Sequence, residues 1–550
     1  MAAPDQNNQE RRDDSGSNED EVIRPEIQEE TGDGRTNLHS SSEHLLDRLL
    51  YKGVLPRYAF PTDVTTFYIF DQARYTKFNP RFEFTPSQSL PVALSQYAPG
   101  KTICVSDKFY TSSAIYAPQE SERDKAWNKR RLYYECQSCG FAKTMSLTEG
   151  NINQEIDCAA CNKSTSMGPA KHWLIPPGFA HAIDIDPGTT SDYEPERSYP
   201  TAAKLTVPAV PDQWIEINDF LRVYHTRENL LVTNKGPRGD GYTYCLSCGR
   251  IESNYVSHFV TSAHTKPFPD TNGRCPRSKG IGENLVLGTE FISDVLLISI
   301  RVKPPLQLEY FKSSTKVALR TLSEALKKAS CLLLELEQQE LEAEFRIAFT
   351  EEGRENMEVE IYIYDTLPGG AGFTKQICDL GIDVFKKALE VLTECPEGCD
   401  SSCYRCLRSF NNKFHHNFLN RDLGASLLNY LLESGNEYIP DQNRLKSSAK
   451  LLYEDLRRQC KESVITLDKT ISPAGYSNLK IPIHISNPDG QEAAVIICDS
   501  LTPDTPPNDQ LSQFLDNPPG SVIPYPVDEL EVKNLLPQIS SKLINDLSMR

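Results

Sequence analysis

The sequence predicts a multidomain protein of the α+β class, and three observations support this prediction. The chain has 550 residues, more than a single typical domain, so about two to four domains are expected. Segments with helical periodicity and segments with strand-like alternation both occur along it. Three separate segments carry cysteines at the spacing of metal ligands. We therefore expect zinc-ribbon-like modules, a denser four-cysteine zinc domain and a C-terminal α/β unit.

Composition and charge restrict the classes of protein that fit. Hydrophobic residues make up 39% of the chain, and the net charge is −18. Residues 1–42 contain 11 acidic residues against 4 arginines and no aromatic residue, which is typical of a disordered acidic tail. A globally basic nucleic-acid coat protein does not fit this charge, although a local basic patch is compatible with it.

No segment suggests a membrane span or a secretory leader. The best apolar run, Phe291 to Ile300, is interrupted by Ser293 and Asp294, and the first residues lack an apolar core. We therefore expect a cytoplasmic protein without membrane contact, where disulfides are rare. The 16 cysteines then need another explanation, and clustered pairs in a reducing compartment are typical of metal ligands.

The N-terminal part is expected to mix strands and helices. Residues 43–51 have a helical pattern, and residues 121–131 form a charged stretch that also favours a helix. β-branched and aromatic residues over 62–70, and alternation over 80–118, predict strands. Residues 181–213 are rich in proline, threonine and acidic residues, which favours a loop or linker.

The middle of the chain carries the clearest periodicities. Residues 285–302 are a candidate buried strand, and residues 315–345 repeat apolar residues at three- and four-residue steps, which predicts one long helix. Residues 358–365 alternate as a strand does. The sequence LPGGAG then ends that strand, and a further helix is expected from Phe373.

The C-terminal part is expected to form a small α/β unit. Helical patterns cover residues 422–434 and 443–460. Three short strands follow, in the sequences IPIHIS, EAAVIICD and SVIPYPV, and a closing helix covers 528–546.

The first cysteine constellation is a pair of CxxC motifs. Cys136 and Cys139 form the first motif, and Cys158 and Cys161 form the second after an interval of 18 residues. Two thiolate pairs on separate turns can close a tetrahedron around zinc, and Gly140 suits a tight turn. The alternative, four thiols that meet nothing, is the weaker reading.

The second constellation has three cysteines and needs a fourth ligand. Cys245 and Cys248 form a CxxC motif, and Cys275 lies downstream. His264 lies in the polar, turn-like segment SAHTKPFPD, whereas His258 lies in the more strand-like YVSHFV, where a core or surface histidine is expected. We favour His264 as the fourth zinc ligand and keep His258 as the alternative.

The third constellation is the densest, with four cysteines within 12 residues: Cys395, Cys399, Cys403 and Cys406. Pro396, Gly398 and Asp400 favour a knot of turns over a helix. Zinc is the favoured metal, and an iron–sulfur cluster is the main competitor because four thiolates suit it too.

These three sites predict about three zinc ions per chain with structural roles. All four positions of each would be filled by protein ligands, whereas a catalytic zinc keeps one position open for water. The chain also lacks GxxxxGK[ST], GxSxG, HExxH and GxGxxG motifs. The glycine run Gly369 to Gly372 could hold a phosphate through free amides, but a tight turn is the favoured interpretation.

One local patch opposes the global acidity. Residues 404–421 contain no acidic residue, and aromatic and basic residues alternate there. Basic side chains beside aromatic faces suit contact with a nucleic-acid backbone and its bases. Equally, the aromatic rings could pack against the zinc knot while the charges face solvent. The candidate residues for contact with nucleic acid or a partner are Arg405, Arg408, Lys413 and Arg421.

The sequence IYIYDTLPGGAGFTKQI, followed by CPEGCDSSCYRCLRSFNNKFHHNFLNR, resembles a C-terminal domain of some DEAD/DEAH-type helicases, the MrfA zinc-binding domain. In that family a strand ending in PGGAG precedes a helix and a four-cysteine cluster. Residues 288–345 resemble its lead-in, and LPRYAFPTDV at 55–64 resembles a segment of the same helicases and their stand-alone relatives. The resemblance covers roughly residues 50–435.

In its size and its lack of a helicase motor, the chain resembles the DrmB proteins of the bacterial DISARM anti-phage system. Those proteins act with a separate helicase, DrmA, so the resemblance implies a DrmA-like helicase and DNA as partners. With this resemblance, six parts are expected: a disordered acidic tail (1–42), an N-terminal α+β segment (43–135), a zinc ribbon (136–165), a linker with the second zinc module (166–284), a helicase-associated MrfA-type zinc-binding domain (285–435) and the C-terminal α/β unit (436–550).

The sequence is compatible with three functions. The first is a non-catalytic zinc-binding partner of a helicase, a subunit that assists DNA engagement in anti-phage defence, with the ATPase in another chain. The second is a nuclease or nuclease-like enzyme that uses the C-terminal α/β unit, although no carboxylate and lysine set is evident there. The third is a zinc-stabilised scaffold or regulator without a nucleic-acid role.

Overall fold

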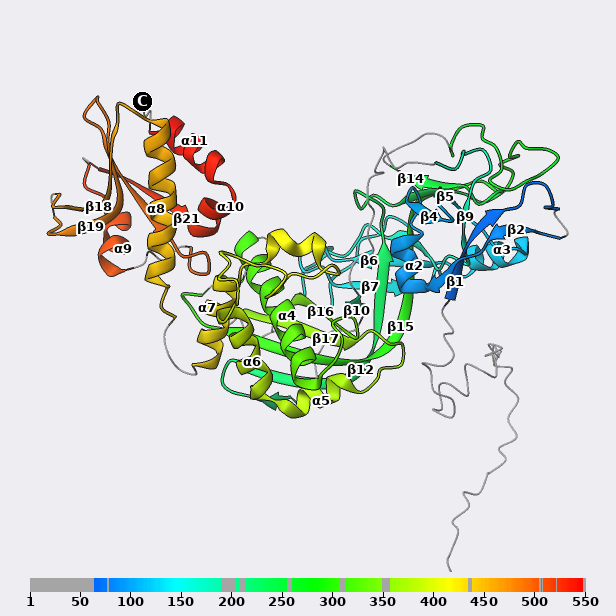
Figure 1. The fold of residues 1–550 in the computed structure, drawn as a ribbon, viewed down its shortest axis with the longest axis horizontal. Coiled ribbons are helices and arrows are strands. Elements are labelled where there is room, and N and C mark those ends of the chain that lie inside the picture. The colour runs from blue at the N-terminus through cyan, green and yellow to red at the C-terminus, as the bar shows by residue number, and fades with distance from the viewer. Residues whose placement is uncertain are drawn as a thin grey trace, which may run out of the picture. The chain divides into compact units, whose positions relative to one another are not determined.

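The computed structural model divides the chain into two compact units, Met1–Leu55 and Pro56–Arg550, and the described residues belong to the second. The expected acidic tail 1–42 and the expected helix 43–51 lie outside the described residues. The described ranges, shown as ribbons in Figure 1, are 64–76, 79–188, 203–206, 214–254, 260–306, 308, 312–348, 357–433, 438–473, 475–503, 506, 508–520 and 522–547.

The first sheet is built from short N-terminal strands and one later strand. Its order is β2-β1-β9-β5-β4, and β3 pairs with β1. The region 80–118, expected as strands, also holds the helix α2, which proline at its first turn helps to begin. The charged stretch expected to be helical is α3. The bounds are β1 Val64–Phe70, β2 Phe82–Phe84, β3 Ser87–Ser89, α2 Leu90–Gln96, β4 Thr102–Val105, β5 Lys108–Ile115, α3 Glu120–Asn128 and β9 Phe179–His181.

A large central sheet is organised around the 22-residue strand β15, Ile281–Val302, which contains the predicted buried strand. It pairs antiparallel with β12 over 14 residues and with β17 further along. β10 lies within the expected linker 181–213. The other strands are β6 Arg131–Glu135, β7 Ala142–Met145, β8 Lys171–Leu174, β10 Lys204–Leu205, β11 Ile215–Glu216, β12 Leu221–Asn234, β13 Tyr242–Cys245, β14 Ile251–Ser253, β16 Leu341–Ala348 and β17 Met357–Asp365.

Helices cover one face of this sheet (Figure 1). Alternate residues of β15, such as Ile298, and of β17, such as Ile361, join one core with α4 Ser313–Leu334, α6 Ile382–Thr393 and α7 Arg421–Leu432. The opposite face, through residues such as Leu297 and Tyr362, packs with β1, α2 and β9 in a second core. Because strand side chains alternate between faces, the long apolar run of β15 serves both cores.

The predicted helix 315–345 is wrong for its last third. α4 ends at Leu334, and Glu335 adopts the left-handed conformation that ends the helix. From Leu341 the apolar residues alternate, and β16 pairs antiparallel with β17. The strand pairing there overrides the helix propensity of a Glu- and Gln-rich segment.

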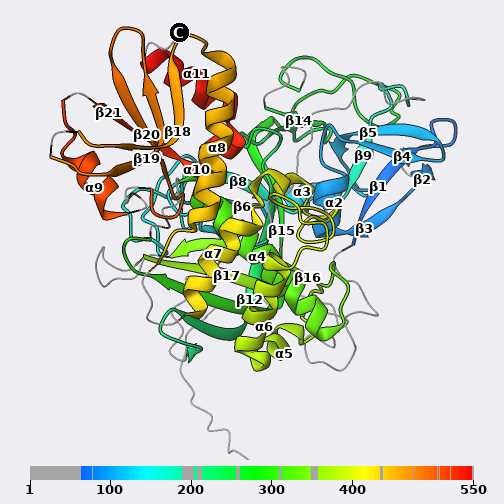
Figure 2. The same ribbon diagram turned by 60° about the vertical axis from the view of Figure 1, so that its left-hand side comes forward.

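The C-terminal part forms a four-stranded sheet of order β18-β19-β20-β21, in which β20 and β21 are parallel (Figure 2). The edge strand β18 and the helix α9 were not predicted, and the expected closing helix is two helices that meet at Leu535. The elements are α8 Gln442–Gln459, β18 Val464–Ile471, β19 Leu479–Ser486, β20 Glu492–Cys498, α9 Asp509–Asp516, β21 Val522–Asp528, α10 Glu529–Asn534 and α11 Leu536–Asp546.

Across the described ranges, none of the helices combines the length and the apolar character that crossing a membrane requires.

Candidate metal centres

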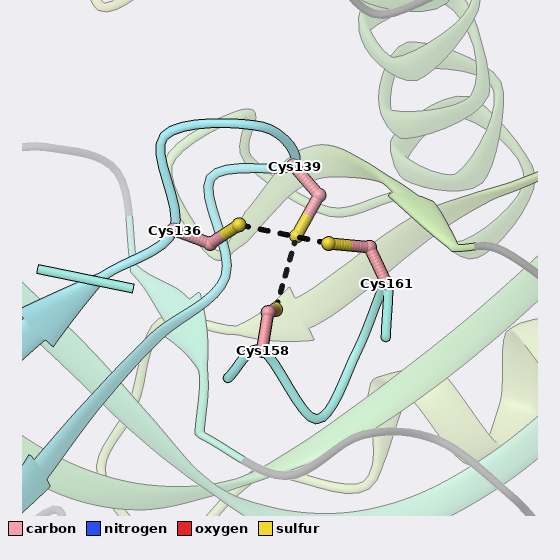
Figure 3. Close-up of side chains that lie close together, drawn as sticks. All are labelled: Cys136, Cys139, Cys158 and Cys161. Atoms are coloured by element: carbon pink, nitrogen blue, oxygen red, sulfur yellow. Dashed lines mark hydrogen bonds between the residues drawn. The ribbon is translucent and has the colours of Figure 1, made fainter. Parts of the chain in front are cut away.

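The first metal centre lies at the end of the β6–β7 hairpin (Figure 3). The Sγ atoms of Cys136 and Cys161 are 3.6 Å apart, as are those of Cys139 and Cys158. All four residues are buried, and their ligand atoms lie within 4.8 Å of one another. Tetrahedral zinc with Zn–S bonds of about 2.3 Å separates its sulfurs by about 3.8 Å, so the cluster fits one zinc ion.

Hydrogen bonds favour the thiolate form of Cys136, whereas burial raises the pKa of Cys139 and that of Cys158. Burial raises the pKa of the Cys136 thiol, yet the Ser166 hydroxyl and backbone N–H groups, including that of Ser138, outweigh it and lower the pKa to about 7. The knuckle closes because the Gly140 N–H donates to the Cys136 carbonyl at 3.0 Å.

The second centre gathers Cys245, Cys248, Cys275 and His264, all with ligand atoms within 4.8 Å. The Cys245 and Cys275 sulfurs are 3.6 Å apart, and the Cys248 Sγ lies 3.2 Å from the His264 Nε2. The other ring nitrogen of His264 lies 3.0 Å from the Ser262 carbonyl, which orients the ring as partners of zinc-bound histidines do. The alternative ligand, His258, lies outside the described residues.

Gly249 allows this second knuckle to lie against the N-terminal sheet. Its φ is +87°, and a Cβ there would come within 2.2 Å of the Ile115 carbonyl oxygen. The buried Arg123 of α3 donates to the carbonyl of Ser247, inside the knuckle, at 3.1 Å. The second metal centre therefore packs directly against β5 and α3.

The third centre follows α6 directly, and four distances define it. The sulfur of Cys395 lies 3.6 Å from those of Cys399 and Cys403, and the sulfur of Cys406 lies 3.6 Å from Cys399 and 3.7 Å from Cys403. The Cys403 N–H donates to the Cys406 Sγ at 3.1 Å. These separations fit a single tetrahedral ion, whereas an iron–sulfur cluster spreads its thiolates over different iron atoms.

The third centre is bound tightly to the helices around it. Lys328 of α4 donates to the carbonyls of Arg405 and Cys406. Arg421, at the start of α7, donates through Nε to the Cys399 carbonyl at 2.8 Å and through Nη1 to the Leu392 carbonyl at 3.3 Å. Arg421 thus bonds inward to the backbone.

The three centres together fit three zinc ions per chain, each held by four protein ligands. We expect metal analysis of the purified full chain to give about three equivalents of zinc and a colourless protein. A brown protein with visible absorbance, or one equivalent of zinc or fewer, would contradict this expectation.

The glycine-rich turn holds a carboxylate of the chain itself. Asp365, at the end of β17, is fully buried, and burial raises its pKa. Its carboxylate accepts the backbone N–H of Ala371 at 2.6 Å and those of Phe373 and Thr374 at 3.2 Å each. Amides that could hold a phosphate at the start of α5, Phe373–Leu380, are therefore occupied, as the tight-turn interpretation requires.

The remaining candidate contact residues differ in how they are held. The Arg405 side chain is 75% exposed and lies 3.7 Å from Glu397. Arg408 donates to the Ser402 hydroxyl at 2.9 Å. The Lys413 ammonium lies 4.1 Å from the centre of the Phe410 ring and 5.0 Å from that of Phe414. Arg405 and Lys413 are the cations best placed to meet a ligand.

The aromatic residues of this segment do not bury themselves against the zinc knot. We call them the aromatic surface, and each has a large exposed fraction: Tyr404 65%, Phe410 73%, Phe414 41% and Phe418 41%. Sequence alone had left burial and exposure of these rings equally open.

Comparison with known proteins places the third centre in a family. Residues 322–407, which include all four of its cysteines, match the MrfA zinc-binding domain. The chain is also 30% identical over 416 residues to the Druantia protein DruE of Escherichia coli (strain UMEA 4076-1). That alignment covers 71% of this chain but 22% of DruE, so the chain spans about a fifth of that protein's length.

Two crystal structures of the DUF1998 helicase MrfA are also similar, each at 11% sequence identity. The structure bound to DNA gives a TM-score of 0.34 and covers 68% of this chain and 34% of MrfA. The structure bound to DNA and AMPPNP gives a TM-score of 0.22 and covers 52% and 29%.

Proposed function

We propose that this chain is a non-catalytic, zinc-stabilised partner of a DEAD/DEAH-type helicase that assists DNA engagement in anti-phage defence. The observation that carries the proposal is the third zinc centre, whose four cysteines lie in the segment that matches the MrfA zinc-binding domain. The similarity to DruE, an anti-phage protein, supports the defence role. The resemblance to DrmB further suggests a DrmA-like helicase as the partner.

A structural role for the zinc ions supports the non-catalytic part of the proposal. Each centre fills its four positions with protein ligands, so a bound ion keeps no position for water or substrate. Among the described residues, groups of three or more potential metal ligands occur only at these centres. A nuclease that uses the C-terminal unit is the alternative, and it has a direct test. A metal-dependent nicking assay of the full chain should show no cleavage above background.

The DNA role can be tested on the full chain alone and together with a DrmA-like helicase, the proposed partner. We expect Arg405→Ser combined with Lys413→Ser to weaken binding to a forked DNA. Each phosphate contact that is lost reduces the number of counterions released when DNA binds. The slope of log affinity against log salt should therefore flatten by roughly 1.5. Lys386→Ser combined with Lys450→Ser is the matched control, since both lysines are more than half exposed and lie elsewhere. Equal slopes for the two pairs would contradict the role of this surface.

The defence role has a separate readout. In a host that carries the gene with its neighbours, deleting the gene should raise the plating efficiency of sensitive phage, and the wild-type gene should restore resistance. Unchanged plating after deletion would refute the defence role whatever the DNA measurements give.

A further inference from the structure

The aromatic surface is exposed on a firmly held segment that ends in a 3-10 helix over Lys413–Phe418. Asn412 is buried and donates through Nδ2 to the Glu324 carboxylate of α4 and to the Leu407 carbonyl, both at 2.9 Å. His416 lies within hydrogen-bond distance of the Ser409 carbonyl, at 3.1 Å. Since the backbone is tied down on both sides of Phe410, the exposure of its ring is a property of the fold.

Contacts between side chains form two groups of rings along this short segment. Lys413 lies over Phe410 and Phe414, and Tyr404 packs edge-on against His416 with ring centroids 5.4 Å apart. Arg405 follows Tyr404 directly and is exposed. Aromatic faces and positive charge therefore occur together, in a segment without acidic residues within a chain of net charge −18.

We propose that the aromatic surface binds single-stranded DNA by stacking unpaired bases on its rings. This inference rests on the proposed DNA role and specifies the form of DNA that the surface takes. Stacked bases in a duplex hide their faces from protein side chains, whereas unpaired bases can lie on exposed aromatic rings. Lys413 and Arg405 then lie where the phosphates of the same strand pass.

Charge complementarity favours a nucleic acid over a protein as the occupant. Exposed aromatic patches of this kind mark binding sites in general, and such sites take proteins as well as nucleic acids. Here, however, the rings share their surface with cations. The chain carries a net charge of −18, so a polyanion is attracted only where cations gather, as they do beside these rings.

Fluorescence anisotropy with the zinc-loaded full chain can test the proposal. The probes are a labelled oligothymidine, an abasic strand of the same length, an oligouridine and a blunt duplex. We expect Tyr404→Ala combined with Phe410→Ala to weaken oligothymidine binding by at least about 30-fold, since two stacking contacts of about 1–3 kcal/mol each are lost. Binding to the duplex should change less than about twofold, and the abasic strand should bind weakly and respond little to the substitutions.

Ile439→Ala is the control, because Ile439 is a 79% exposed apolar residue outside the aromatic surface. Zinc content must stay at the wild-type value in each variant, and a variant that loses zinc is replaced by Phe410→Leu, which keeps an apolar side chain but removes the ring. Tighter binding of oligouridine than of oligothymidine would overturn the assignment to DNA.

The remaining outcomes distinguish failure of the stacking inference from failure of the proposed function. If the wild type binds duplex and single strand equally and the substitutions weaken both alike, the stacking inference fails while the proposed DNA role stands. If the chain binds no DNA either alone or with its helicase, the proposed function fails with it. Loss of helicase co-elution with unchanged oligothymidine affinity would assign the surface to a protein partner and overturn the inference.

Discussion

Replacing Cys406 by serine should remove one zinc ion of three and produce the largest loss of stability of any single substitution considered for this chain. Metal binding at a structural site contributes directly to folding, with apparent free energies of about 10–16 kcal/mol in zinc-finger peptides. Cys406 is 2% exposed and belongs to the core formed with α4, α6 and α7. The metal links the turns that join α6 to α7, so its loss removes the bonds that hold these turns together.

Cys378→Ser is the matched control for this experiment. Cys378 is a half-buried free cysteine on α5 that belongs to none of the three metal centres. We expect Cys406→Ser to contain about two zinc ions and to unfold at markedly lower denaturant concentration, and Cys378→Ser to keep three zinc ions and near wild-type stability. A Cys406→Ser protein with native stability would contradict a structural role for the third centre.

The metal centres were the part of the molecule most open to prediction from sequence. The structure gathers all twelve residues that spacing and turn chemistry had singled out. Two cysteines separated by two residues reach one metal through a single local turn, so their geometry depends little on the rest of the fold. Only the choice of His264 depended on a judgement about the segment around it.

Features set by tertiary contacts were less open to prediction. The helix expected over 315–345 ends early because β16 pairs with β17, a contact that the local pattern does not contain. The exposure of Phe410 was also undetermined, since the sequence of the segment fits rings that pack against the zinc site and rings that face solvent equally well. Asp365 is buried and accepts hydrogen bonds from three backbone amides of the turn that follows β17, an arrangement that the local sequence pattern does not contain.

A buried charge cluster in the C-terminal unit had no signal in the sequence. Arg444 of α8 forms ion pairs with Asp499, which follows β20, and with Glu529, which begins α10. Side-chain exposure is 4% for Arg444, 0% for Asp499 and 3% for Glu529. Tyr438 donates to the Asp499 carboxylate at 3.1 Å, and Lys533 lies 3.2 Å from Glu529. Arg444, Asp499 and Glu529 are far apart in sequence, and the parallel pairing of β20 and β21 brings the two acids to one edge of the sheet.

Arg444→Met should therefore lower the free energy of unfolding by about 3–5 kcal/mol, because removing one partner of a buried pair leaves uncompensated charge in the interior. Lys450→Met, on the same helix, is the control. Lys450 pairs with Glu454, both side chains are more than half exposed, and exposed pairs contribute about 0–1 kcal/mol. Denaturant unfolding of both variants measures the difference.

The pH dependence of the Arg444→Met deficit distinguishes buried charge from lost packing. Burial already raises the pKa of Glu529 above its usual value, while Arg444 and Lys533 oppose that rise. Without Arg444 the folded-state pKa rises further, so the folded variant binds a proton at a pH where the unfolded chain does not. The deficit should be largest at neutral pH and shrink as the pH falls toward the usual pKa of glutamic acid. Adding Glu529→Gln and Asp499→Asn to Arg444→Met should recover part of the stability at neutral pH, since the two buried acids that faced Arg444 no longer carry charge. A deficit that is independent of pH and unaffected by these neutral substitutions would assign the loss to packing alone.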